Sequence, residues 1–102
     1  MTEAAAQSLS TAERAAAAAL SVPGVAGLHG GEFGTVATYL PGRRVTGVRI
    51  DDSGCSVHVT VRYPADLFAV ADAVRTAVRA IVDTPVDVTI EDLTADRTGP
   101  QQ

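Results

Sequence analysis

The residues that could carry out chemistry are few, and their spacing does not form a catalytic constellation. His29 and Glu32 are three residues apart and could act as a metal-binding or acid–base pair. A zinc site needs at least three protein ligands, however, and this segment supplies two. The single cysteine, Cys55, has no second thiol for an internal disulfide, and no serine has an evident base beside it. We therefore predict that the protein is not an enzyme and that it holds no cofactor or metal.

A glycine-rich segment suggests two further kinds of site. Its five glycines are Gly24, Gly27, Gly30, Gly31 and Gly34. The segment lacks the Gly-Lys-Ser/Thr ending of a nucleotide-hydrolase phosphate loop. Residues 27–30 and 31–34 both fit the G-x-x-G pattern with which KH domains clamp nucleotides. A segment with this many glycines produces such matches by chance. In addition, Glu32 stands where a phosphate-binding loop would have a cation. We predict a structural segment, in which glycines serve turns and close approach to an Ala-rich helix. A KH-like nucleic-acid-binding module is the alternative.

The composition favours a small globular domain and disfavours a nucleic-acid partner. The 102 residues are 46% hydrophobic and 20% charged, and the net charge is −4. Proteins that bind phosphate backbones usually carry a basic excess, and Arg43 and Arg44 form only a small basic spot. The sequence shows neither a signal peptide nor an apolar run long enough to cross a bilayer. We predict a cytoplasmic protein with no direct membrane insertion.

The candidate residues must be positioned by a single folded domain. We predict that this domain covers residues 10–93 and that flexible tails precede it at 1–9 and follow it at 94–102. The capping box that starts at Ser10 and ends at Glu13 predicts a first helix, whose apolar face is nearly all Ala. That helix is expected to end before Pro23, because a proline disfavours helical geometry in the residue before it.

Hydrophobic alternation predicts the strands. Residues 45–51 and 55–63 are expected to pair as an antiparallel hairpin, and in the second of them Cys55 and three valines alternate with polar residues. A second helix is predicted over residues 67–82, followed by a strand over residues 86–93. This strand–helix–strand order favours a right-handed crossover between parallel strands. The predicted fold class is α+β with two layers: a small mixed β-sheet with helices packed on one face and a polar opposite face.

Two surfaces are candidates for contacts with other molecules. Phe68, Asp72, Arg75 and Arg79 recur at helical spacing opposite the apolar stripe of the second helix. They form either a solvated face, with an Asp72–Arg75 pair and Phe68 tucked against a strand end, or a contact patch, since an exposed Phe beside Arg is typical of protein interfaces. The second candidate is the polar sheet face, which holds Arg49, His58 and Arg62.

The order of several segments adds a resemblance to a known family. VPGVAGL, TVATYL, TGVRI, CSVHVTVRY and VDVTIEDL follow one another between Thr11 and about Leu93. With the Pro23-Gly24-Val25 start and the Gly30-Gly31 pair, this order resembles the alkaline shock protein family, the Gram-positive envelope stress response proteins typified by alkaline shock protein twenty-three. The Ala-rich composition, in which every basic residue is Arg, is typical of a high-GC source such as an actinobacterium.

The resemblance implies a non-enzymatic cytoplasmic protein that forms homo-oligomers. Some members of the family gather beneath the membrane by binding a small membrane-anchor protein, so it also implies a peripheral position at the inner face of the cell membrane. The family has no catalytic residues to place on this sequence. On this basis we predict a structural or interaction protein of the cell-envelope stress response.

Overall fold

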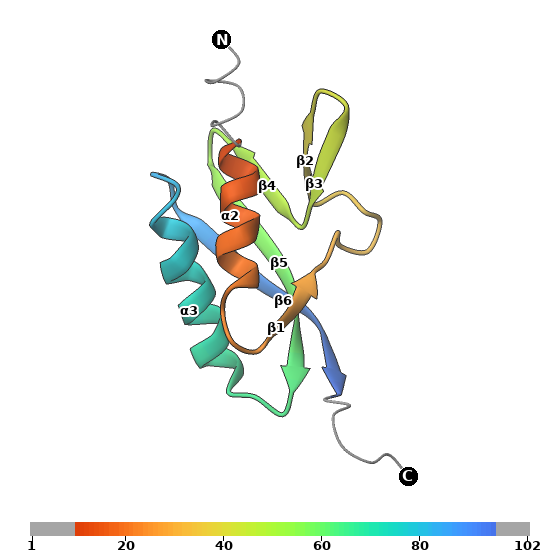
Figure 1. Ribbon diagram of the computed structural model, residues 1–102, viewed down its shortest axis with the longest axis vertical. Helices are drawn as coiled ribbons and strands as arrows, with labels where there is room; N and C mark the ends of the chain where they lie inside the picture. The colour runs from red at the N-terminus through yellow and green to blue at the C-terminus, as the bar shows by residue number, and fades with distance from the viewer. Residues whose placement is uncertain (1–9, 96–102) are drawn as a thin grey trace.

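Two helices cover one face of a mixed β-sheet in the computed structural model, which describes residues 10–95 (Figure 1). The predicted α+β class is therefore confirmed. The elements in chain order are α2 (Thr11–Leu20), β1 (Val25–Leu28), β2 (Ala37–Leu40), β3 (Arg43–Thr46), β4 (Val48–Asp51), β5 (Gly54–Tyr63), α3 (Leu67–Arg79) and β6 (Val86–Ala95). Thr94 and Ala95 belong to β6 instead of a tail. The rest of the predicted tails, 1–9 and 96–102, lies outside the described residues.

The first helix begins at the predicted capping box. The Glu13 backbone N–H donates to Ser10 Oγ at 3.0 Å, and the Ser10 backbone N–H donates to Glu13 Oε1 at 3.1 Å. Two orphan donors of the helix start are thereby satisfied. The helix buries only alanines, which let neighbouring elements approach its backbone closely: Ala12, Ala15, Ala16 and Ala19.

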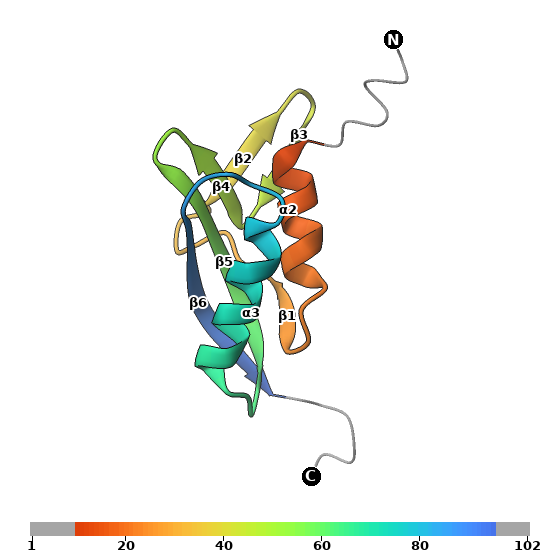
Figure 2. The same ribbon diagram turned by 90° about the vertical axis from the view of Figure 1, so that its left-hand side faces the viewer.

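The sheet is organised around β5, which has partners along both edges. β1 and β4 are antiparallel to it, with Val25 opposite Val61 and Val48 opposite Val57, and β6 runs parallel along the other edge. The predicted hairpin and the predicted parallel crossover are both confirmed. Both helices lie on the same side of this sheet (Figure 2).

The structure corrects the prediction in the first half of the chain. The single strand expected over residues 45–51 is two strands separated by Gly47: β4 pairs with β5, whereas β3 pairs with β2 in a separate two-stranded sheet. β1 and β2 were not predicted, because they are four residues long and lie within or just after the glycine-rich segment. Strands this short carry too little alternation to be recognised.

The core lies between the helices and the sheet and is built from small side chains. Fully buried positions include Val57, Val59 and Val61 of β5 and Val74 and Val78 of α3. Cys55 is 2% exposed and lies on the same buried face of β5 as these valines, where it acts as a small hydrophobe. α3 ends at Arg79, three residues before the predicted end, since Val78 O accepts from the N–H groups of both Ile81 and Val82 and the chain turns there.

An ion pair ties the start of α2 to the β2–β3 hairpin. Arg43 Nε donates to Glu13 Oε2 at 2.5 Å, and Arg43 Nη2 donates to Glu13 Oε1 at 3.1 Å. These bonds, together with the Ser10 backbone N–H, lower the pKa of the Glu13 carboxyl from 4.5 to about 2.

We expect Glu13→Gln to lower the melting temperature in a pH-dependent way. Because the pKa of Glu13 is depressed in the folded state, its stabilising effect is complete above the unfolded pKa of 4.5 and is lost as the pH falls toward about 2. Circular dichroism melts from about pH 7 down to about pH 2 should therefore show a difference between wild type and variant that shrinks with acidification. Gln keeps the length needed for the capping box, so a difference independent of pH would contradict the role of the charge.

Candidate interaction surface

The α3 helix positions the predicted stripe. The Asp66 side chain caps it, with the Ala69 backbone N–H donating to Asp66 Oδ1 at 3.1 Å. Val70, Val74 and Val78 face the core at helical spacing, and this fixes the rotation of the helix about its axis. The face of α3 that these valines leave outside the core carries the predicted residues, and its Arg75 and Arg79 lie beside the start of β6. We call its members, Phe68, Asp72, Arg75 and Arg79, the α3 stripe.

The geometry of the α3 stripe decides between the two interpretations of Phe68. The Phe68 side chain is 90% exposed, so it is not tucked against the strand end. The Asp72–Arg75 pair is present, with 3.3 Å between Arg75 Nη1 and Asp72 Oδ1. The solvent-exposed ring of Phe68 thus lies along the same side of α3 as the Asp72–Arg75 ion pair and the cation of Arg79.

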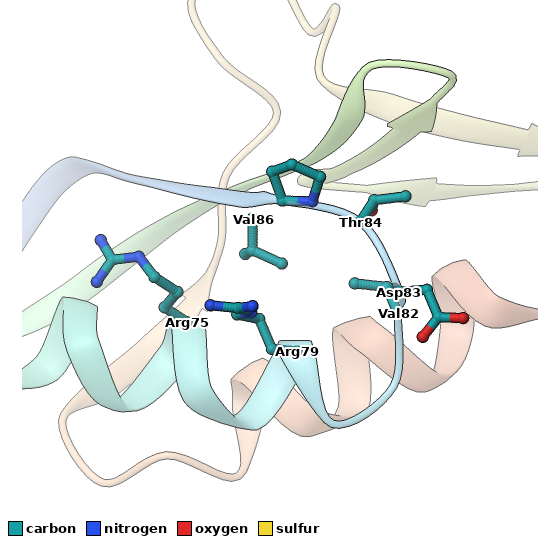
Figure 3. A pocket seen from close by; sticks show the side chains of 7 residues that line it. Arg75, Arg79, Val82, Asp83, Thr84 and Val86 are labelled. Atoms are coloured by element: carbon teal, nitrogen blue, oxygen red, sulfur yellow. The ribbon is translucent and has the colours of Figure 1, made fainter.

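A hollow of about 480 Å³ borders the α3 stripe at the end of α3. Figure 3 shows Arg75 and Arg79 extending from α3 toward the start of β6, while the carboxylate of Asp83 points away from them. Arg79 forms no ion pair within residues 10–95. The Thr84 Oγ1 atom at the rim is buried without a hydrogen-bond partner. The hollow is therefore polar and cationic at one wall, and it continues the exposed face of α3.

The structure does not bring the three sheet-face residues together into one site. Arg49 Nε lies 3.9 Å from Asp51 Oδ2 on the same strand. Arg62 Nη1 donates to Val25 O at 3.0 Å, and this contact holds β1 against β5. His58 Nδ1 hydrogen-bonds to Glu91 Oε2. Each side chain thus serves a local contact in the sheet.

The half-buried His58–Glu91 pair is a contact that the sequence reasoning missed. The two side chains are 19% and 24% exposed, so His58 is not the solvated residue expected on a polar face. Glu91 is the extra residue of a bulge in β6, since Ile90 pairs with Val59 and Asp92 pairs with Thr60. The glycine-rich segment passes close to the pair, since a Cβ atom on Gly31 would lie 4.0 Å from Glu91 Oε2.

The glycine-rich segment serves turns, but its predicted close approach to the Ala-rich helix is wrong. Gly24, Gly31 and Gly34 have positive φ angles of 97°, 83° and 69°, which favour glycine. A Cβ atom on Gly24 would instead meet Val70 of α3 at 3.1 Å, and Gly27 lies in β1 with open space around it. On Gly30 it would meet Thr46, and on Gly31 it would meet Val36. The glycines therefore allow the backbone of this segment to approach α3 at one end and the β2–β3 hairpin at the other.

The two G-x-x-G matches have different structures. Residues 27–30 end β1, where the His29 backbone N–H donates to His58 O at 2.8 Å. Residues 31–34 form a tight turn, in which the Gly34 N–H donates to Gly31 O at 3.2 Å and Glu32 is exposed. The first match is occupied by strand pairing, and the second presents an acid where a phosphate would lie.

His29 and Cys55 are the remaining candidate groups for chemistry. His29 Nδ1 accepts from the Gly31 N–H at 2.9 Å, and burial raises the pKa of the Cys55 thiol. Over residues 10–95, no three His, Cys, Asp or Glu side chains are grouped closely enough to hold a metal ion. In the same part of the chain, no helix has the length and apolar character needed to span a membrane.

Comparisons of the chain with protein-family models, with curated proteins and with solved structures find no match. The resemblance to the alkaline shock protein family therefore stays a prediction. The α3 stripe is the one predicted set of residues that the structure brings together on an exposed face.

Proposed function

We propose that this chain is a non-enzymatic interaction protein that self-associates through the α3 stripe. The observation that carries the proposal is the 90% exposure of Phe68 in line with Arg75 and Arg79. Exposed aromatic side chains next to arginine are enriched where interfaces gain most of their energy. The sequence has two phenylalanines, and both are exposed to solvent, Phe33 by 82%. The core consists mainly of valine and alanine side chains.

Self-association also suits the size of the domain. A domain of this length buries a smaller share of its chain than a larger one does, so contacts between copies add needed stability. The family resemblance extends the proposal to a place in the cell: a cytoplasmic member of the envelope stress response, held at the inner face of the membrane by a small anchor protein. This part rests on the order of the segments between Thr11 and about Leu93.

The test of the proposal is the double variant Phe68→Ala/Arg75→Ala. We expect it to weaken self-association at least about tenfold, because it removes the aromatic anchor and one cation of the α3 stripe, and about 1.4 kcal/mol corresponds to a tenfold change in Kd. Light scattering behind size exclusion over a concentration series measures the effect. Circular dichroism should show an unchanged fold.

Phe33→Ala is the matched control, since Phe33 is also highly exposed but lies in the loop between β1 and β2. It is expected to leave assembly unchanged. Assembly that survives the double variant would refute the α3 stripe as the contact surface. Repeating the series with a generic RNA tests the KH-like alternative: a monomer that shifts only when RNA is added would overturn self-association in favour of nucleic-acid binding.

A further inference from the structure

The α3 stripe has a symmetric order along its helix. Its four members are separated by four, three and four positions, so the same spacing is met from either end, and the midpoint falls between Ala73 and Val74. We propose that α3 packs antiparallel against α3 of a second copy, about a two-fold axis that passes between residues 73 and 74. This inference rests on the proposed self-association and gives it a geometry.

The chemistry of the α3 stripe is complementary to itself in this arrangement. The two-fold axis sets Asp72 opposite Arg75 of the second copy, and it does so twice, because a two-fold interface repeats each contact. It also sets Phe68 opposite Arg79 of the second copy, where a guanidinium can lie over the aromatic face. Arg79, which forms no ion pair within residues 10–95, gains a partner in this way.

The residues beside the α3 stripe allow two helices to come close. Small, exposed side chains lie along one side of it, namely Ala69, Ala73 and Thr76 of α3 and the C-cap residue Ala80. Helix pairs approach to about 8–10 Å between axes, and small side chains favour the near end of this range. The outer face of α3 is therefore shaped for a helix, with charge and aromatic groups that fix its direction.

The open edge of β6 is a poorer contact for a second copy. Within the described residues β6 pairs only with β5, so its outer edge is free. Antiparallel pairing of two β6 strands about Thr89 would set Asp87 opposite Glu91 of the second copy. Like charges directly opposite each other destabilise a strand pair, and charged edge residues commonly prevent such pairing.

The expected dimer is weak. One face of a 13-residue helix gives a contact near or below the ~1,200 Å² at the small end of specific interfaces. We therefore expect dissociation constants of about micromolar or weaker, and a measured mass that rises with protein concentration.

Charge reversal across the axis tests the geometry. In D72R both members of each intermolecular pair are cations, and in R75D both are carboxylates. Each variant alone is expected to dimerise about tenfold more weakly than wild type, because attraction becomes repulsion at two symmetric contacts. In an equimolar mixture, every D72R–R75D contact pairs opposite charges again. Sedimentation of the two variants, separately and mixed, should show that mixing restores the dimer.

The mixture distinguishes contacts between copies from the Asp72–Arg75 pair within one chain, which mixing cannot restore. The matched control is the exposed Arg49–Asp51 pair of β4, and neither R49D nor D51R should change association. Two results would overturn the two-fold packing while self-association of the wild type is retained. In the first, D72R and R75D each associate as strongly as the wild type. In the second, their mixture stays dissociated. A wild-type protein that is monomeric at every concentration would refute the proposed function itself.

Discussion

Val74→Asp is expected to unfold the domain. Val74 is fully buried at the middle of α3, between the helix and the sheet. A carboxylate placed there loses its hydration, and a buried acid has its pKa raised by up to about 3–5 units. At neutral pH this costs about 4 kcal/mol, because a carboxyl whose pKa is raised above about 7 is protonated in the folded state and a further rise adds nothing. Loss of the valine side chain removes about another 1.5 kcal/mol of burial. The sum reaches the lower end of the usual range of folding stability, about 5–15 kcal/mol, where a domain this small is expected to lie.

The matched control is Thr76→Asp, which places the same charge two residues further along α3 on its exposed face. We expect it to change the free energy of unfolding by no more than about 0.5 kcal/mol. Far-ultraviolet circular dichroism and urea titration of both variants measure the difference. A folded Val74→Asp protein at neutral pH would mean that α3 does not pack on the sheet by its valine face.

Gly47→Ala is expected to cost about 3 kcal/mol of folding free energy. Gly47 has a φ of +88°, where an alanine costs about 1–2 kcal/mol. Its Cβ atom would in addition lie 2.7 Å from Leu28 Cβ and 3.1 Å from the His29 backbone N. These atoms cannot move away easily, because the His29 N–H donates to His58 O, and overlap in a packed site adds about 1–3 kcal/mol.

Gly42→Ala separates the two causes of this loss. Gly42 has a similar φ of +77°, but a Cβ atom there would have open space around it in the β2–β3 turn. We expect a loss of about 1 kcal/mol, from backbone strain alone. Chemical denaturation of both variants gives the comparison. Equal losses would contradict the close packing of β1, β4 and β5 around Gly47.

The parts of the fold that were predictable from the sequence are those with a long periodic signal. The alternation in residues 55–63 and the capping box at Ser10 and Glu13 both reflect local geometry, which the structure retains. The parallel pairing of β5 and β6 followed from the strand–helix–strand order, because a helical crossover is the usual connection between parallel strands. These features need no knowledge of distant contacts.

The parts that were not predictable depend on contacts between distant segments. β1 and β2 become strands only because β5 and β3 supply partners for four residues each. The break at Gly47 arises where β1 and β4 meet beside β5, and an isolated glycine between two apolar stretches does not reveal this. The glycine neighbours were assigned to the wrong helix for the same reason, since Gly24 approaches Val70 of α3.

The candidate site divides in the same way. The composition of the α3 stripe follows from helical spacing alone, whereas the exposure of Phe68, which the spacing left open, follows from the structure. The hollow beside Arg75 depends on how the chain turns between α3 and β6. The contact of His58 with Glu91 depends on a one-residue bulge, which shifts the register without changing the alternation before it.

The central position of β5 also constrains the order of events during synthesis. β1, which joins the sheet through pairs such as Val25 with Val61, leaves the ribosome long before its partner strand does. Until then the apolar residues of α2 and β1 have no sheet to cover, and the two-stranded β2–β3 unit is too small to be stable alone. We therefore expect the N-terminal half to acquire its structure only after β5, α3 and β6 have emerged.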